Sequence, residues 1–268
     1  MKTNQKNSLH TFVVLAYKES KYLDSCLNSV TNQSYPSNVI IATTTPNSHI
    51  ARLAKKYNVK TITGKHTNIG GDFDFAKNSG TTELVTVAHQ DDIYDESFSE
   101  NVVAAFRKNQ ESSIIFTNYY EIRNGNNVYS NALLRIKHVL LLPLSINKSA
   151  KSIWRKRLIL RFGNSICCPA VTFVRKNCPK EVFSSDFQCN VDWHAWEKLS
   201  RSKGAFTYIK KPLMGHRISE ESTTSEIIKN GIRTKEDYEL FKRFWPKPLA
   251  KILTKFYQKS EKSNSLKD

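Results

Sequence analysis

Strand-like and helix-like segments alternate through the first 90 residues, and this alternation constrains the fold more than any other feature of the chain. Runs of branched and small apolar residues occur at 11–17, 38–45, 59–64 and 83–90. The segments 19–33, 48–58 and 70–81 between them carry apolar residues at helical spacing. Repeated units of this kind form a mostly parallel sheet with helices on both faces. The sequence therefore predicts an α/β fold.

The second half is less regular and adds further elements to the same domain. We expect helices at 97–109 and 192–204, strands at 112–124, 167–176 and 205–219, and a basic amphipathic region at 139–163. The tail from Lys242 onward is basic and reads as a helical extension that ends in polar residues.

The chain is strongly basic, with 41 Lys and Arg against 24 Asp and Glu and a net charge of +17. Such a surface suits nucleic acid, a membrane surface or a phosphorylated ligand. No helix-turn-helix, zinc-finger or RNP-type motif occurs, so we expect no nucleic-acid partner. The basic stretch 151–161 is interleaved with Trp154 and Leu158, and it is either a solvated helix face or a surface for anionic lipid.

The five cysteines show no paired zinc-site spacing, and Cys167 and Cys168 are adjacent, so we expect reduced thiols and a cytoplasmic protein. The N-terminal residues contain no apolar stretch typical of a signal peptide. No run reaches the roughly 20 apolar residues that span a bilayer. We therefore expect a protein that does not cross a membrane.

Two adjacent carboxylates, Asp91 and Asp92, directly follow the apolar strand segment 83–90. Ligands of open parallel sheets bind outside the carboxyl ends of the strands, so this pair should meet residues 17–19 and 43–45 in one crevice. Two carboxylates there can hold a divalent cation together with substrate phosphates. The alternative is a helix N-cap for the segment that follows.

The order and spacing of four segments make the chain resemble a family 2 glycosyltransferase of the GT-A fold, from about residue 10 to about residue 225. These segments are "VVLAYKESKYLDSCLNSVTNQSY", "NIGGDFDFAKNSGTTELVTVAHQDD", "NVDWHAW" and "MGHRISEEST". The resemblance implies a Rossmann-like central sheet flanked by helices. It also implies a GT-A domain over 1–225, with a nucleotide half at about 10–95 and an acceptor half at about 96–225, followed by a helical extension at 226–268.

The resemblance also implies roles for individual residues. Asp192 stands where the family has its catalytic base, Asp92 and His216 would bind Mn²⁺ or Mg²⁺, and Trp193 and Trp196 would stack on the acceptor sugar. The implied nucleotide-binding residues are Ala16, Tyr17, Glu19, Thr43, Thr44, Lys77, Asp91 and Arg217. The loop after His216 would close over the bound nucleotide.

Two positions depart from the family pattern. An acid that reads the base commonly ends the second strand of the family, and this chain has "ATTTPN" there. Another Asp commonly begins the acidic motif, and this chain has His89. The first departure leaves the base open among uridine, thymidine and guanosine, with uridine favoured.

Each assigned role has a structural alternative. Asp192 can be an N-cap of the helix that follows, and two Trp residues at spacing i, i+3 are more often core residues than sugar platforms. His216 can be an ordinary surface histidine.

The function that follows is inverting transfer of a sugar from a nucleotide-sugar donor to a glycan or lipid-linked oligosaccharide acceptor in bacterial surface polysaccharide synthesis. It would take place in the cytoplasm, with peripheral contact at the inner face of the membrane. A non-catalytic module that binds nucleotide or glycan in the same crevice is the alternative.

Overall fold

The computed structural model describes residues 8–146, 149–218 and 231–262. Its helices are α1 (Leu23–Thr31), α2 (Ser48–Tyr57), α3 (Ile69–Ser79), α4 (Phe98–Lys108), α5 (Ala132–Ile146), α6 (Ile153–Leu158), α7 (Val191–Ser200), α9 (Ile232–Lys242) and α10 (Lys247–Lys262). Its strands are β1 (His10–Ala16), β2 (Asn38–Thr43), β3 (Lys60–Thr63), β4 (Leu84–His89), β5 (Ile93–Tyr94), β6 (Ser112–Arg123), β7 (Asn126–Val128), β8 (Ser149–Ala150), β9 (Val171–Val174) and β10 (Ala205–Ile218).

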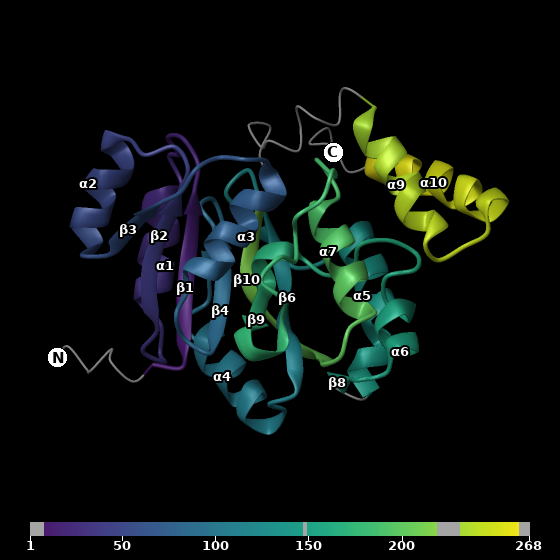
Figure 1. Ribbon diagram of the computed structural model, residues 1–268, viewed down its shortest axis with the longest axis horizontal. Coiled ribbons are helices and arrows are strands. Elements are labelled where there is room, and N and C mark those ends of the chain that lie inside the picture. The colour runs from purple at the N-terminus through teal and green to yellow at the C-terminus, as the bar shows by residue number, and fades with distance from the viewer. Residues whose placement is uncertain (1–7, 147–148, 219–230, 263–268) are drawn as a thin grey trace.

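One curled sheet in the order β3-β2-β1-β4-β9-β6-β10-β5 runs through the molecule, with helices on both sides (Figure 1). The β1–β2, β1–β4, β2–β3 and β6–β10 pairs are parallel and contain most of the paired residues. β9 runs antiparallel to both β4 and β6. The predicted α/β architecture is confirmed, and the sheet is mixed in its second half because β9 inserts in the opposite direction.

The apolar character of β1 follows from burial on both of its faces, as expected for a central strand of a parallel sheet. Phe12 and Val14 pack with α1 and α4, whereas Val13 points into the other core with α3 and α7. All three side chains are fully buried. Burial of each contributes about 1.5–3 kcal/mol, so this strand anchors the edge on which the site is built.

The C-terminal extension is helical as predicted, and it shares the main core. Phe241 of α9 and Tyr257 of α10 pack on the indole of Trp193, with ring centroids 5.1 and 5.7 Å away. The sequence-based boundary at 225 falls on residues outside the described ranges. Within those ranges, no helix is long and apolar enough to cross a bilayer.

Candidate active site

Asp91 and Asp92 follow β4 at the carboxyl end of the parallel strands, where the sequence places them. The Asp92 carboxylate is fully buried, and its Oδ1 accepts a hydrogen bond of 2.8 Å from the backbone N–H of Arg217. Asp92 leads into the short strand β5, while the next helix, α4, begins only at Phe98. The helix N-cap alternative for this pair is therefore wrong.

His216 reaches Asp92 because β10 pairs with β5 through Gly215 and Met214. Its Nδ1 lies 3.2 Å from Oδ1 of Asp92. A Cβ at Gly215 would come within 2.6 Å of the Tyr120 ring, so this close approach of β10 needs glycine. Burial lowers the pKa of His216, but the charge and hydrogen bonding of Asp92 outweigh it and raise the pKa overall.

His89 completes a cluster that can hold a metal ion. One ligand atom from each of His89, Asp91 and Asp92 lies within 4.8 Å of the others. The buried Nε2 of His89 finds no hydrogen-bond partner among the described residues. Burial raises the pKa of Asp91, and the charge of Asp92 adds to this shift. An imidazole nitrogen and carboxylate oxygens that repel one another fit a divalent cation. The sequence noted His89 only as a departure from the family pattern.

Arg217 is fixed beside this cluster by two contacts. Its Nε donates to the backbone oxygen of Asp91 at 2.9 Å, and its guanidinium lies 4.2 Å from the ring centroid of Tyr22. These contacts hold a permanent positive charge at the mouth of the crevice. The closing loop predicted after His216 extends into residues 219–230, outside the described part of the chain.

The loop after β1 forms the next part of the crevice. The Gln90 side chain makes two hydrogen bonds of 3.0 Å with the Tyr17 backbone. Its Oε1 accepts from the Tyr17 N–H, and its Nε2 donates to the Tyr17 oxygen. Tyr17 is 39% exposed, and Glu19 on the same loop is also exposed. Ala16 and Thr43 lie opposite each other on β1 and β2 and are fully buried. Each is the last residue of its strand, directly before the loops that carry Tyr17 and Thr44.

Thr44 contacts an acidic residue that the sequence did not identify. Its hydroxyl donates to Oδ2 of Asp72 on α3 at 3.1 Å, and Nδ1 of His66 lies 2.8 Å from the same oxygen. Asp72 is only 8% exposed, and its Oδ1 has no hydrogen-bond partner among the described residues. A carboxylate therefore does lie at the end of β2, but it is Asp72 from the helix α3 and not a residue of the strand itself.

Asp192 lies in the first turn of α7, one position after the helix start, so it is not the N-cap. Its Oδ2 accepts 2.6 Å from the Asn164 amide and its Oδ1 accepts 2.7 Å from the N–H of Trp193. Burial raises the pKa of Asp192, and these two hydrogen bonds oppose the shift only in part. A carboxylate with a raised pKa and a fixed orientation has the properties of a general base.

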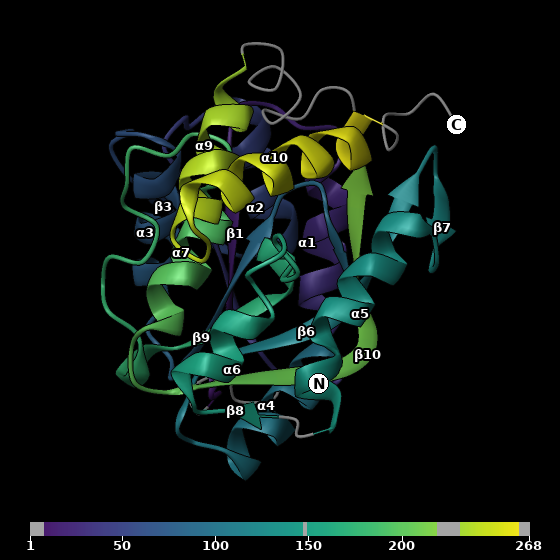
Figure 2. The same ribbon diagram turned by 90° about the vertical axis from the view of Figure 1, so that its right-hand side faces the viewer.

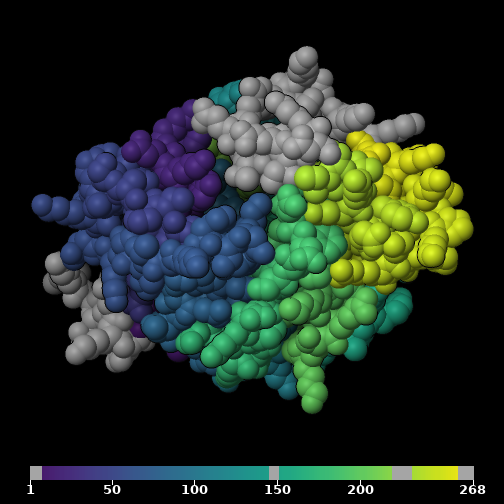
Figure 3. Space-filling view, turned by 45° about the horizontal axis from the view of Figure 1, so that its top comes forward, coloured from purple at the N-terminus to yellow at the C-terminus, as the bar shows by residue number. Residues whose placement is uncertain are grey.

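The turn Cys168–Ala170 (η2) lies near both acidic centres. Burial raises the pKa of the Cys168 thiol, and the charges of Asp192 and Asp92 both add to the shift. The turn is held in place by a 2.7 Å hydrogen bond from the Tyr94 hydroxyl to the Pro169 oxygen. Asp92 and Asp192 therefore act on the pKa of the same thiol, Cys168. Figure 3 shows a hollow bordered by purple, blue and green parts of the chain.

The sequence matches the family model for glycosyl transferase family 2 over residues 11–176. The chain belongs to glycosyl transferase family 2. No curated protein matches it significantly. Among solved structures it is similar to S. aureus TarS 1–349, with a TM-score of 0.58, 14% identity, and 87% of this chain and 64% of that chain covered. It is also similar to a mannosyltransferase from Pyrobaculum calidifontis, with a TM-score of 0.55, 10% identity, and 96% and 76% covered.

These similarities show that this family 2 chain has the fold of glycosyltransferases of the GT-A type. The chain spans about 64% of the length of the TarS structure it matches. TarS 1–349 has been solved with UDP-GlcNAc, and the mannosyltransferase with GDP-Man and Mn²⁺.

Three residues predicted from the family resemblance do not lie where their roles require. Lys77, near the end of α3, is buried and donates from Nζ to the Pro179 oxygen at 3.0 Å, so it turns away from the crevice. Trp193 and Trp196 are both fully buried. Trp196 packs against Phe173 and Phe183 in the core. An acceptor sugar cannot stack on a ring that has no exposed face, so the acceptor-binding role of both tryptophans is wrong.

Lys137 on α5 is a site residue that sequence reasoning missed. Its Nζ donates to the Tyr119 hydroxyl at 2.8 Å. Its charge acts on the pKa of both Asp192 and His216, lowering each. Its charge therefore acts on both the proposed base and the proposed metal cluster. The available signal was weak, because Lys137 is one of three basic residues, with Arg135 and His138, on a helix that is otherwise mainly apolar.

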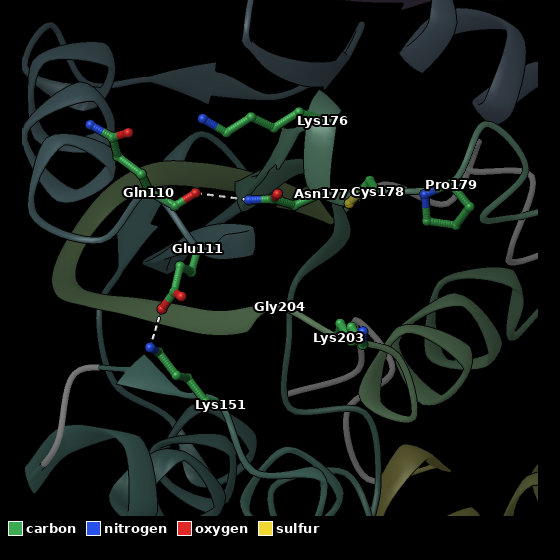
Figure 4. A pocket seen from close by; sticks show the side chains of 9 residues that line it. All are labelled: Gln110, Glu111, Lys151, Lys176, Asn177, Cys178, Pro179, Lys203 and Gly204. Carbon is green, nitrogen blue, oxygen red and sulfur yellow. Dashed lines mark hydrogen bonds and ion pairs between the residues drawn. The ribbon is translucent and has the colours of Figure 1, made fainter.

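A second pocket, of about 740 Å³, lies away from this crevice (Figure 4). Glu111 and Gly204, which line it, immediately precede the starts of β6 and β10. It is therefore at the amino ends of these parallel strands. Lys151 is paired with Glu111, and Lys176 with Glu83. The pocket is separate from the crevice that holds the acidic residues.

Proposed function

We propose that this chain is an inverting, metal-dependent hexosyl- or N-acetylhexosaminyltransferase that uses a UDP-sugar. Its acceptor would be a hydroxyl of a glycan or lipid-linked oligosaccharide in bacterial surface polysaccharide synthesis. It would act in the cytoplasm, at the inner face of the membrane. One observation supports this above all: His89, Asp91 and Asp92 form a cluster at the carboxyl end of β4. The oriented carboxylate of Asp192 acts on the pKa of the same thiol, Cys168, as Asp92 does.

Asp92 is the principal residue of the donor side. Its contacts with the Arg217 backbone and with His216 fix the carboxylate before any ligand arrives. Asp91, Asp92, His89 and His216 are the proposed ligands of Mn²⁺ or Mg²⁺. When bound, such an ion neutralises charge on the leaving diphosphate. Arg217 adds a fixed positive charge at the same end.

Asp192 takes the proton from the acceptor hydroxyl as that oxygen attacks the anomeric carbon. The pKa raised by burial makes it a stronger base than an exposed carboxylate. Hydrogen bonds from Asn164 and the Trp193 N–H keep it pointing in one direction. Attack from the side opposite the diphosphate inverts the anomeric configuration.

Asp72 is the proposed reader of the base. Its buried, unpartnered Oδ1 can accept the N3–H of uracil, whereas cytosine has an acceptor at N3. Thr44 and His66 hold the other oxygen of Asp72 in place. This arrangement replaces the acid that the family commonly carries at the end of the second strand. The TarS complex with UDP-GlcNAc supports a uridine donor, and the mannosyltransferase complex shows that the fold also accepts GDP-Man.

The test is thermal unfolding against UDP, TDP, GDP, CDP and their sugars, each with and without Mn²⁺. A ligand at 100 times its dissociation constant should stabilise the protein by about 2.7 kcal/mol. We expect UDP to act most strongly, and only with metal. Asp92→Asn should abolish the metal-dependent part, whereas Glu96→Gln, at an exposed acid in the turn after β5, should not.

Asp72→Asn should weaken UDP binding by about 1–3 kcal/mol and move the preference toward CDP, because an amide can donate to N3 of cytosine. Absence of any nucleotide effect on the unmodified chain would contradict the proposed function. Nucleotide binding without donor hydrolysis or sugar transfer would instead identify a binding module.

A further inference from the structure

Exposed apolar side chains are concentrated on one group of helices. Of the eleven exposed large apolar residues in the described ranges, nine lie on α5, on α10, or on α6 and the residues just after it. They are Ile136, Val139, Leu142, Ile153, Trp154, Phe162, Leu249, Ile252 and Phe256, which we call the helical face. α5, α6 and α10 lie on the same side of the molecule, the side toward the viewer in Figure 2. Solvated surfaces rarely gather so many apolar residues without a partner.

On the helix α5, the exposed apolar residues lie on a different side from the residues that pack into the core. Leu134, Leu141 and Leu144 already bury one side of the helix in the core. The opposite side presents Ile136, Val139 and Leu142, which are 50%, 62% and 54% exposed. The solvated face of a helix normally carries polar residues, so the apolar residues on the outer side of α5 indicate a partner that covers them.

Aromatic residues extend the helical face toward α10. Trp154 on α6 and Phe256 on α10 are each 67% exposed. The segment after α6 packs on α10, because a Cβ at Gly163 would meet the Tyr257 ring at 2.7 Å. The Arg161 guanidinium lies 4.2 Å from the Trp245 ring centroid, and the Arg161 backbone oxygen accepts a hydrogen bond of 2.7 Å from the Trp245 indole N–H. Apolar rings and fixed guanidinium groups thus occur together at one surface.

The charge on α5 and α6 has one sign. Between Glu121 and Glu181 the chain contains no Asp or Glu, and this interval includes all of α5 and α6. On α10, Lys251 and Lys255 are exposed on the solvent side, beside Ile252 and Phe256. Apolar side chains that enter the acyl boundary, flanked by Lys and Arg at headgroup level, characterise helices that lie on anionic membranes.

We propose that the helical face docks on an anionic lipid surface, with Trp154, Phe256 and the outer side of α5 entering the interface. This inference deepens the proposed function, since it would bring the crevice to a lipid-linked acceptor. Lipid binding itself needs neither donor nor metal. It can therefore be tested separately from transfer.

The experiment is co-sedimentation of the full chain with vesicles of phosphatidylglycerol, compared with vesicles of phosphatidylcholine, at two salt concentrations. We expect binding to the anionic vesicles that weakens with salt, together with a blue shift of Trp154 fluorescence that Trp154→Phe removes. The double variant Trp154→Gln/Phe256→Gln should bind at least ten-fold more weakly.

Two double charge-reversal variants distinguish binding through the helical face from general attraction between a basic protein and anionic vesicles. Lys251→Glu/Lys255→Glu should lower vesicle affinity by about ten-fold or more. Lys55→Glu/Lys60→Glu changes the charge equally at α2 and β3, far from α10 (Figure 1), and should have a much smaller effect.

Equal loss in both charge-reversal variants, or no binding by the unmodified chain, would overturn the proposal. So would a dimer in sedimentation that Trp154→Gln/Phe256→Gln abolishes, because a second copy would then be the occupant. Nucleotide-dependent stabilisation should be unchanged in all these variants. If it persists while vesicle binding fails, only the lipid proposal is wrong.

Discussion

Asp192 gives the sharpest prediction at the scale of single residues. Asp192→Asn keeps an oxygen that can accept from Trp193 but cannot take a proton, so we expect kcat to fall by about 10²- to 10⁴-fold. Nucleotide-dependent stabilisation should be unchanged. Asp186→Asn, an exposed acid on the preceding segment, is the matched control. Near-full turnover by Asp192→Asn, measured with the same donor and acceptor, would show that the base lies elsewhere.

The hydrogen bond from Asn164 makes a prediction about pH. Burial raises the pKa of Asp192, and the Asn164 amide lowers it by stabilising the charged carboxylate. A general base acts when deprotonated, so activity should fall as the pH drops through this pKa. Asn164→Ala removes the stabilisation, raises the pKa further, and should move the acid limb of the kcat profile to higher pH. An unmoved limb would mean that another group controls it.

At the scale of secondary-structure elements, the C-terminal helix α9 helps to position the proposed base. Oε1 of Glu236 on α9 accepts the N–H of Gln188 at 2.6 Å, and its Oε2 accepts those of Cys189 and Asn190 at 2.9 and 2.8 Å. These residues lead directly into α7 and Asp192. The helix α9 thus fixes the start of the helix that carries the proposed base.

Glu236→Gln should therefore affect both stability and turnover. The amide presents N–H groups to backbone donors, so we expect a loss of about 1–3 kcal/mol in urea unfolding, together with a lower kcat at unchanged nucleotide affinity. Glu239→Gln on the same helix, whose side chain is 53% exposed, should change neither quantity. A fall in stability without any effect on kcat would separate α9 from the positioning of Asp192.

At the scale of the whole molecule, the net charge of +17 is the dominant property. Self-repulsion destabilises a compact state of high charge, and salt screens it. Raising the ionic strength from about 0.01 to 0.15 M shortens the Debye length from roughly 30 to 8 Å. The free energy of unfolding should rise with salt while affinity for anionic vesicles falls. Stability that decreases over this range in urea titrations would contradict the argument from net charge.

The sequence by itself determined the features that depend on local pattern. Alternating apolar segments specified the α/β layers, because period and length identify strands and helices without knowledge of their neighbours. The place of Asp91 and Asp92 followed from the same pattern, since carboxyl ends of parallel strands share one edge. The family resemblance added the assignment of Asp192, which remains a prediction.

The tertiary structure decided which side chains are buried and which distant residues they contact. Trp193 lies in the core because α9 and α10 cover it, and Trp196 because it packs on Phe173 and Phe183. No local pattern contains these contacts. Asp72 reaches Thr44 from a separate helix, and the charge of Lys137 acts on two groups distant in sequence, Asp192 and His216. Helical period shows which residues share a face, but only packing between distant segments determines whether that face meets core, crevice or solvent.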